Sequence, residues 1–200
     1  MAAHRMNGDW RLDWAFPALG RLPTTLPWRL VRWLGRFGIA VSPGWLASVC
    51  PDWFEPSVRR ESRLAGYVLL AGQGELRLLP DVPEPAMCHD WTLAEGEHAW
   101  PGWHGRLRVW REAGRGLVLP DGIIMQVRPG QVAETIRHAV GRKTLKKCWQ
   151  EAGISDWQRR RWPRLWLGGI LVAVPGVVQD HALSARPGQS GWCFAWEGPA

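Results

Sequence analysis

Apolar positions recur at helical spacing near the start of this chain. Between Trp28 and Phe37 they fall every three or four residues, while arginines occupy the positions between them. Pro27 suits the first turn of a helix, and Gly38 suits its end. Ser42-Pro43 then has the form of a cap followed by a first helical residue, which predicts a second short helix up to about Val49.

The middle of the chain shows strand patterns instead. Leu64–Ala71 predicts a strand, Gly72-Gln73-Gly74 a turn, and Glu75–Leu79 the returning strand of a hairpin. The stretch Pro80–Pro101 is rich in proline and acidic residues and contains no Lys or Arg, so it predicts mostly loop or linker. Three further short strands are predicted at 105–110, 116–120 and 123–128.

The last third returns to a helical period. Lys143–Ala152 predicts a helix with one apolar stripe and one polar stripe. The apolar stripe is Leu145, Cys148, Trp149 and Ala152, and the polar stripe is Lys143, Lys146, Lys147 and Gln150. Ser155 or Asp156 caps a short helix through Arg161, which Pro163 ends. A hairpin at 164–174 follows, turning at Gly168-Gly169, and 177–178 and 192–196 add strands.

Together these elements predict an α+β fold made of two small domains, each a helix pair with short antiparallel strands or hairpins. We place a helical and hairpin domain at residues 1–80. A Pro/Gly-rich acidic linker with short strands occupies 81–122, and a C-terminal α/β domain occupies 123–200.

The basic charge is concentrated in one segment of the chain. Of the net charge of +7, all lies in residues 137–166, which hold nine basic and two acidic residues; elsewhere the two signs balance. All three lysines lie there, against 22 arginines in the whole chain. A lysine stripe on a helix is usually only a solvated face. Confinement of the whole excess to one window favours contacts with the phosphates of a nucleic acid.

Tryptophan is also unusually frequent, with 16 residues against four Phe and one Tyr. Trp149 lies on the apolar stripe and is expected in the core. Trp157, Trp162 and Trp166 interleave the basic segment, where they either pack internally or stack on bases; packing is the favoured interpretation.

Motifs for catalysis or metal binding do not stand out. The chain has no phosphate loop, nucleophile elbow or zinc-protease motif. Cys88, His89, His98 and His104 match no standard metal spacing. We therefore predict no catalytic residue, no metal site and no cofactor in this chain. The lack of a signal segment and of a long apolar span predicts a cytoplasmic protein with reduced cysteines and no membrane partner.

The segment Gly141–Ile154 resembles the C-terminal domain of bacterial tRNA(Ile)-lysidine synthase, with its basic Lys-Lys helix followed by a Gln-Glu-x-Gly turn. Gly191–Trp196 fits the family's closing strand, and Trp28–Leu34 and Arg63–Leu79 resemble more loosely the helix and hairpin of its substrate-binding domain. The family's later landmarks correspond here to Trp157, Arg159, Pro163, Ala173 and Gly176.

The resemblance implies a tRNA-binding domain at 123–200 that docks on the acceptor stem of an isoleucine tRNA with a CAU anticodon. A-form RNA is read mainly through its shape and backbone, which suits cationic side chains on a helix. The tRNA-binding residues expected on this basis are Arg142, Lys143, Lys146, Lys147, Gln150, Arg159, Arg160 and Arg161.

Family members join lysine to the wobble cytidine of that tRNA with ATP and Mg²⁺, in a PP-loop domain marked by an SGGxDS motif. This sequence contains no such motif; its one Ser-Gly is Ser190-Gly191. We therefore expect the polypeptide to be inactive alone. The alternative is a protein-interaction subunit, or a fragment of a split enzyme, that binds a separate PP-loop ATPase chain.

Overall fold

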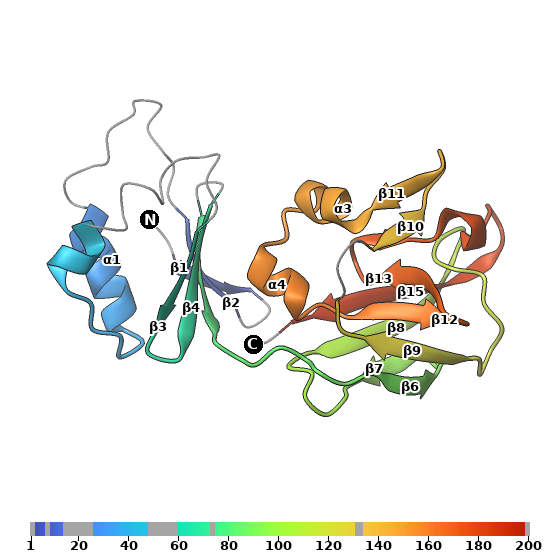
Figure 1. Cartoon of the computed structure of the whole chain (residues 1–200), viewed down its shortest axis with the longest axis horizontal. Coiled ribbons are helices and arrows are strands. Elements are labelled where there is room, and N and C mark those ends of the chain that lie inside the picture. The colour runs from blue at the N-terminus through green and yellow to red at the C-terminus, as the bar shows by residue number, and fades with distance from the viewer. Residues whose placement is uncertain are drawn as a thin grey trace. The chain divides into compact units, whose positions relative to one another are not determined.

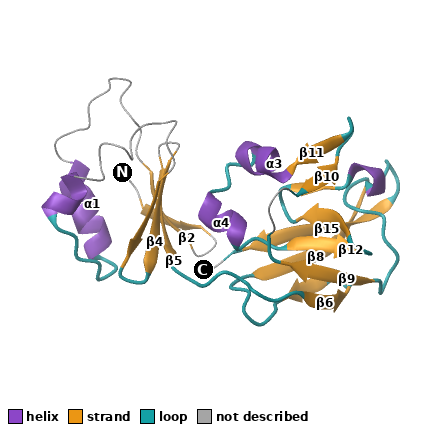
Figure 2. Cartoon of the chain, viewed as in Figure 1, coloured by secondary structure: helices purple, strands orange, loops and turns teal. Residues whose placement is uncertain are grey.

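The computed structural model describes residues 3–6, 9–13, 26–47, 60–72, 75–130 and 134–198. The chain divides into two compact units, residues 1–81 and residues 82–199, which we call the first and second unit. Figures 1 and 2 show that both are built mostly from antiparallel strands, with few and short helices. The prediction of an α+β fold with antiparallel strands is confirmed to this extent.

The first unit is a five-stranded antiparallel sheet covered by a helix, α1 (Leu26–Gly35). Leu30 and Leu34 of α1 pack with Leu76 and Leu78 of the sheet, and all four are buried. The sheet order is β1-β2-β5-β4-β3, with β1 (Ala3–Met6), β2 (Asp9–Asp13), β3 (Arg60–Leu64), β4 (Tyr67–Gly72) and β5 (Glu75–Pro80).

Both helix predictions in this unit are confirmed where the structure describes them. Gly38 follows α1 with a φ of +72°, a value that glycine adopts without strain. Residues 43–47 are helical, and the backbone amide of Trp45 donates to the Ser42 hydroxyl at 3.1 Å. The predicted end near Val49 lies outside the described residues.

The strand expected at Leu64–Ala71 is two strands. β3 ends at Leu64, a turn occupies Ala65 and Gly66, and β4 begins at Tyr67, which pairs with Leu64. Both turn residues have positive φ. Because apolar residues lie on both sides of the turn, periodicity did not separate the strands. The β4–β5 hairpin itself is confirmed; its turn residues 73 and 74 lie outside the described part of the chain.

The second unit contains two sheets packed face to face. Strands of both contribute to one buried cluster, including Met125 and Leu165 from one sheet and Leu107 and Trp192 from the other. The first sheet has the order β14-β13-β12-β9-β6 and the second β15-β8-β7. Their bounds are β6 (His89–Thr92), β7 (Gly96–His98), β8 (Arg106–Ala113), β9 (Ile124–Arg128), β12 (Arg164–Leu167), β13 (Ile170–Val174), β14 (Val178–Gln179) and β15 (Ser190–Glu197).

The stretch Pro80–Pro101, expected as mostly loop, contains β6 and β7. Trp91 of β6 pairs with Met125 of β9, and both side chains are buried. The partners lie more than thirty residues apart in sequence, so local composition did not reveal the pairing. By contrast, the strand expected at 116–120 forms only isolated bridges from Leu117 to Ser184 and Trp192, beside the short helix η1 (His181–Leu183).

A third layer lies on the first of these sheets. It contains the hairpin β10 (Thr135–Arg137) and β11 (Arg142–Thr144), followed by α3 (Leu145–Glu151) and α4 (Asp156–Arg160). The buried side of α3 packs with Leu171 and Val174 of β13. Figure 1 shows α3 continuing directly from β11. A packed helix pair in each domain is not confirmed.

Two details of the predicted helix at 143–152 are wrong. Lys143 belongs to β11, where it pairs with Ile136, because Thr144 is extended and forms the cap of the helix. Ala152 is the exposed C-cap and does not extend the buried stripe of Leu145, Cys148 and Trp149. The next helix is confirmed, with Ser155 and Gln158 forming a reciprocal capping box.

Gly116 offers a local test of this unit. Its φ is +82°, and a methyl group there would collide with the backbone carbonyl of Trp192. We expect Gly116→Ala to lower the free energy of unfolding by about 1–3 kcal/mol, through strain in both backbone and contact. Urea unfolding measures the change. Gly122→Ala is the control, since Gly122 also has positive φ but open space around it; equal losses for the two variants would contradict the role of the close contact.

Candidate nucleic-acid interface

The polar side of α3 exposes three of the predicted RNA-binding residues. Lys146, Lys147 and Gln150 are all exposed, while Cys148 and Trp149 on the other side are buried. We call the first three the lysine face. No described residue forms an ion pair with either lysine. Because the buried side fixes the helix on the sheet, both lysines are held on the exposed side of the helix.

Most other cations of the basic segment are neutralised within the protein. Arg142, Lys146 and Lys147 are the bases between residues 137 and 166 that make no ion pair with a described residue. Three of the partners, Glu84, Glu134 and Asp180, come from outside that segment. The pairs are Arg137–Asp180, Lys143–Glu151, Arg159–Asp156, Arg160–Glu84, Arg161–Glu84 and Arg164–Glu134.

Arg142 and Lys143 lie on β11, immediately before the helix. Arg142 is exposed, and its Nε donates to the Thr135 hydroxyl on the paired strand at 2.9 Å. The Lys143 Nζ donates to Glu151 Oε2 at 2.5 Å. This hydrogen bond raises the pKa of Lys143 and lowers the pKa of Glu151. Both groups therefore stay charged at neutral pH, and Lys143 presents less free positive charge than its neighbours.

The three consecutive arginines have contacts of their own around α4. The Arg159 Nε donates to the Ile154 carbonyl at 2.9 Å, and its Nη1 pairs with Asp156 at 2.7 Å. The exposed Arg160 pairs with Glu84 at 2.7 Å. Arg161 is buried, donates to the carbonyls of Val82 and Trp157, and lies 4.1 Å from the centre of the Trp157 ring.

The tryptophans of the basic segment are buried or half-buried in the protein. Trp149 and Trp157 are buried, as the favoured interpretation expected. Trp162 is half-buried, meets Trp149 edge-on at 6.0 Å, and donates its indole N–H to the Pro175 carbonyl at 2.9 Å. Trp166 is half-buried, with the Arg128 guanidinium 4.8 Å from its ring centre.

One buried ion pair was not anticipated. Arg164 and Glu134 are each only 6% exposed, and Arg164 Nε lies 3.1 Å from Glu134 Oε2. The Nη1 of Arg164 also donates to the carbonyls of Arg159 and Trp162, at 2.7 and 2.8 Å. Burial lowers the pKa of Arg164, and Glu134 opposes that shift. From the sequence, Arg164 is one of the nine basic residues of 137–166, and no local pattern indicates its partner Glu134.

The remaining candidates of the sequence analysis form no site in the described residues. No group of three or more His, Cys, Asp or Glu residues is placed there to hold a metal ion. Cys88 is exposed and Cys148 and Cys193 are buried, and all three are free thiols. Among the described helices, none has the length and apolar character to cross a membrane.

Comparison with known proteins finds a domain-family match within the second unit. Residues 123–196 match the family model described as the TilS substrate C-terminal domain. This segment contains the whole layer of α3, α4 and the β10–β11 hairpin. The resemblance of this segment to the C-terminal domain of tRNA(Ile)-lysidine synthase is confirmed.

Curated relatives extend the similarity beyond this domain. The chain is 35% identical over 156 residues to the tRNA(Ile)-lysidine synthase of Salmonella choleraesuis strain SC-B67. The aligned region covers 72% of this chain and 32% of that protein. The chain is 38% identical over 85 residues to the synthase of Yersinia pseudotuberculosis serotype I, spanning 36% of this chain and 18% of that protein. The chain thus covers about a third or less of these relatives.

A solved structure described as the crystal structure of the TilS C-terminal domain is also similar to this chain. The match has a TM-score of 0.41 and a sequence identity of 20%, and it covers 55% of this chain and 96% of that one.

Proposed function

We propose that the second unit is the tRNA-binding part of a tRNA(Ile)-lysidine synthase and docks on the acceptor stem of an isoleucine tRNA. One observation carries this proposal. Lys146 and Lys147 project from one side of a helix fixed by its buried side, without an ion pair among the described residues. Unpaired cations held in this way neutralise phosphates of an RNA backbone and release its counterions.

Arg142 and Gln150 complete the proposed surface, since both are exposed; Gln150 lies on the same helix as the two lysines, and Arg142 lies on the strand that precedes it. Gln150 is positioned to hydrogen-bond phosphate or ribose oxygens. Arg159 and Arg160 contribute weaker positive potential, because Asp156 and Glu84 offset their charges. Arg161 contributes no direct contact to this proposal, because it is buried and donates to protein carbonyls.

In this proposal the full reaction is the one named by the family: ATP-dependent joining of lysine to the wobble cytidine of the tRNA with a CAU anticodon. The second unit holds the acceptor stem and thereby positions the distant anticodon loop for a PP-loop domain. ATP and Mg²⁺ belong to that domain. We assign no catalytic residue to the described part of this chain.

Equilibrium binding to isoleucine tRNA over a range of salt concentrations tests the proposal. We expect measurable binding with log K falling linearly as log salt rises, by about two to three units per tenfold increase, given three unpaired cations. A tRNA acceptor-stem hairpin should compete with the intact tRNA. Absence of binding at low salt, or binding without salt dependence, contradicts the proposal. Retention of a PP-loop protein after nuclease treatment would instead favour the split-enzyme alternative.

Glu151 supplies a prediction of the opposite sign. In Glu151→Gln, Lys143 loses the carboxylate that it now contacts, and the surface gains one net positive charge. We expect tighter RNA binding at low salt and a salt dependence steeper by about one unit. Binding titrations at several salt concentrations measure both. Glu197→Gln, which removes an exposed carboxylate on β15, is the control. If this variant gains as much RNA affinity as Glu151→Gln, the effect comes from net charge alone.

A further inference from the structure

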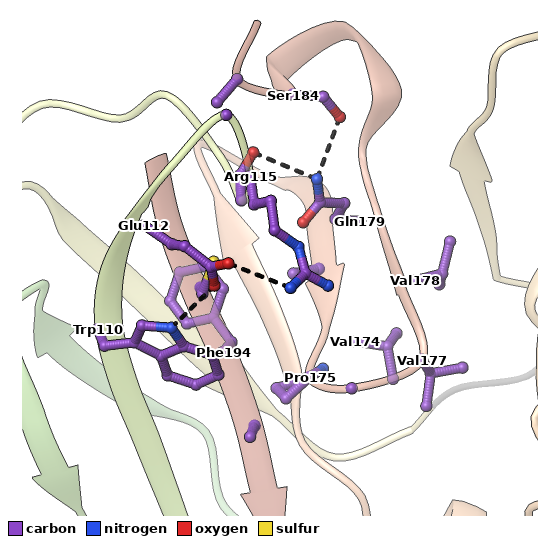
Figure 3. A pocket seen from close by; sticks show the side chains of 17 residues that line it. Trp110, Glu112, Arg115, Val174, Pro175, Val177, Val178, Gln179, Ser184 and Phe194 are labelled. Carbon is purple, nitrogen blue, oxygen red and sulfur yellow. Dashed lines mark hydrogen bonds and ion pairs between the residues drawn. The ribbon is translucent and has the colours of Figure 1, made fainter. Parts of the chain in front are cut away.

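A pocket of about 610 Å³ lies in the second unit, and none of the predicted tRNA-binding residues lines it (Figure 3). Strands β8 and β15 form one side of it, and β13 and β14 with their connecting turn form the other. The turn is tied to β15 by a hydrogen bond of 3.1 Å from the Gly176 amide to the Phe194 carbonyl. Pockets of this size accept a small organic ring system with room to spare.

One wall of the pocket is polar and fixed. Glu112 accepts a hydrogen bond from the Trp110 indole at 3.3 Å through Oε2, and one from Arg115 at 3.1 Å through Oε1. Both hydrogen bonds lower the pKa of Glu112, and the one from Trp110 has the larger effect. The carboxylate is therefore charged at neutral pH. The Arg115 side chain is nevertheless 74% exposed, which leaves its other N–H groups available to a ligand.

A second polar group has an orientation set by the protein. The Gln179 Nε2 donates to the Gly116 carbonyl and to the Ser184 hydroxyl, each at 3.2 Å. Figure 3 shows this amide between Ser184 and Arg115. With its nitrogen used in this way, its carbonyl oxygen is left as an acceptor, and no described group donates to it. The facing wall is apolar and contains Val174 and Val177.

An apolar wall, an indole, two acceptors and one cation together suit a flat heteroaromatic ring with an amine on its edge. A nucleobase has this chemistry, and unpaired RNA bases are recognised by such a combination of apolar contact and edge hydrogen bonds. Arg108, whose guanidinium lies 5.6 Å from the Trp110 ring centre, and Arg115 provide positive charge for the attached phosphates.

Strand β13 contacts both the pocket and the helix that carries the lysine face. Val174 of β13 is part of the pocket wall and of the buried cluster that holds α3. Val177 and Val178 pack against that cluster too and also line the pocket. The same strand therefore supports both the helix on which an RNA duplex would lie and the pocket proposed for a nucleotide.

We propose that this pocket binds one unpaired base carrying an exocyclic amine, from the single-stranded 3′ end that continues an RNA duplex held on the lysine face. The inference rests on the proposed function and adds to it a site for a base. Stacking and edge contacts of one base are worth about tenfold or more in affinity.

Two RNA hairpins, one blunt and one with a short single-stranded 3′ end containing 2-aminopurine, test the proposal with the full chain. We expect the hairpin with the 3′ end to bind about tenfold more tightly, with quenching of the 2-aminopurine fluorescence. Trp110→Leu should remove both effects and leave the affinity for the blunt hairpin unchanged. Arg115→Ala, at a position whose side chain is 74% exposed, should reduce the gain. Trp100→Leu, outside the pocket, is the matched control and should retain it.

The two proposals fail in different ways. Equal binding of both hairpins to the wild-type chain overturns the pocket proposal, and leaves the lysine face supported if Lys146→Ala/Lys147→Ala weakens both. A gain that survives both Trp110→Leu and Arg115→Ala also overturns it. If neither hairpin binds at low salt, the proposed function itself is overturned, and the pocket proposal with it.

Discussion

Arg164→Ala is expected to lower the free energy of unfolding of the second unit by about 3–5 kcal/mol, because it leaves the Glu134 carboxylate buried without its cation. The same change leaves the carbonyls of Arg159 and Trp162 without the donor that they share. Because Arg164 begins β12 and Glu134 precedes β10, the variant also loosens the layer that holds α3.

Amide hydrogen exchange read by mass spectrometry resolves this loss within the second unit and uses the first unit as an internal reference. Arg106→Ala is the matched control, since its pair with Glu97 joins side chains that are 67% and 55% exposed. Exposed pairs contribute at most about 1 kcal/mol. If the two variants lose equal stability, the Arg164–Glu134 pair does not have the role inferred from its burial.

Lys146→Ala/Lys147→Ala is expected to weaken RNA binding on the order of tenfold at low salt, and to reduce the salt dependence by about two units. Both side chains are exposed, so the loss reflects phosphate contacts and leaves the fold intact. The weakening should be similar for different RNA sequences, because backbone contacts carry no sequence information. Binding titrations at several salt concentrations give both quantities.

Two further variants separate charge at this position from total charge. Lys146→Arg/Lys147→Arg keeps the cations and should retain most of the affinity. Arg106→Ala/Arg186→Ala removes the same net charge from exposed positions away from α3 and should change binding little. An unchanged affinity and salt dependence in the lysine-to-alanine variant would show that RNA, if bound, is held elsewhere.

Local signals in the sequence were sufficient for the short-range elements. The helical period at 28–37, the cap at Ser155 and the Gly168-Gly169 turn each predict structure within a few residues, and each is present. The strands β6 and β7 were missed because their composition is that of a loop, and because β6 pairs with residues more than thirty positions away in sequence. The break between β3 and β4 was missed because apolar residues continue through the turn.

For the candidate site, the sequence predicted the exposed lysines but overestimated the available charge. The window of 137–166 is strongly basic in sequence, yet acidic residues at 84, 134 and 180 approach it in the folded unit. Such neutralisation depends on tertiary structure and leaves no local pattern. The polar groups of the pocket come from β8, β14 and the segment after β8, so no motif in the sequence connects them.

The structure also gives a physical reason for the preference for tryptophan and arginine. Arginine guanidinium groups lie over indole rings at distances of 4.1–5.6 Å, as with Arg111 over Trp192. Guanidinium is planar and weakly hydrated, so it stacks better than an ammonium group. The Trp192 indole also donates to the Leu119 carbonyl at 3.1 Å, which phenylalanine cannot do. Each such tryptophan fills space, supports a cation or closes a hydrogen bond.

Strand β13 contributes buried residues to two clusters. Val172 belongs to the core between the sheets, and Leu171 and Val174 belong to the cluster under α3. A separation of the α3 layer by itself would expose Leu171 and Val174 to water, at a cost of roughly 1.5–3 kcal/mol for each side chain. The lysine face and the sheets beneath it are thus expected to open together, as one cooperative unit, and not by fraying of the outer layer.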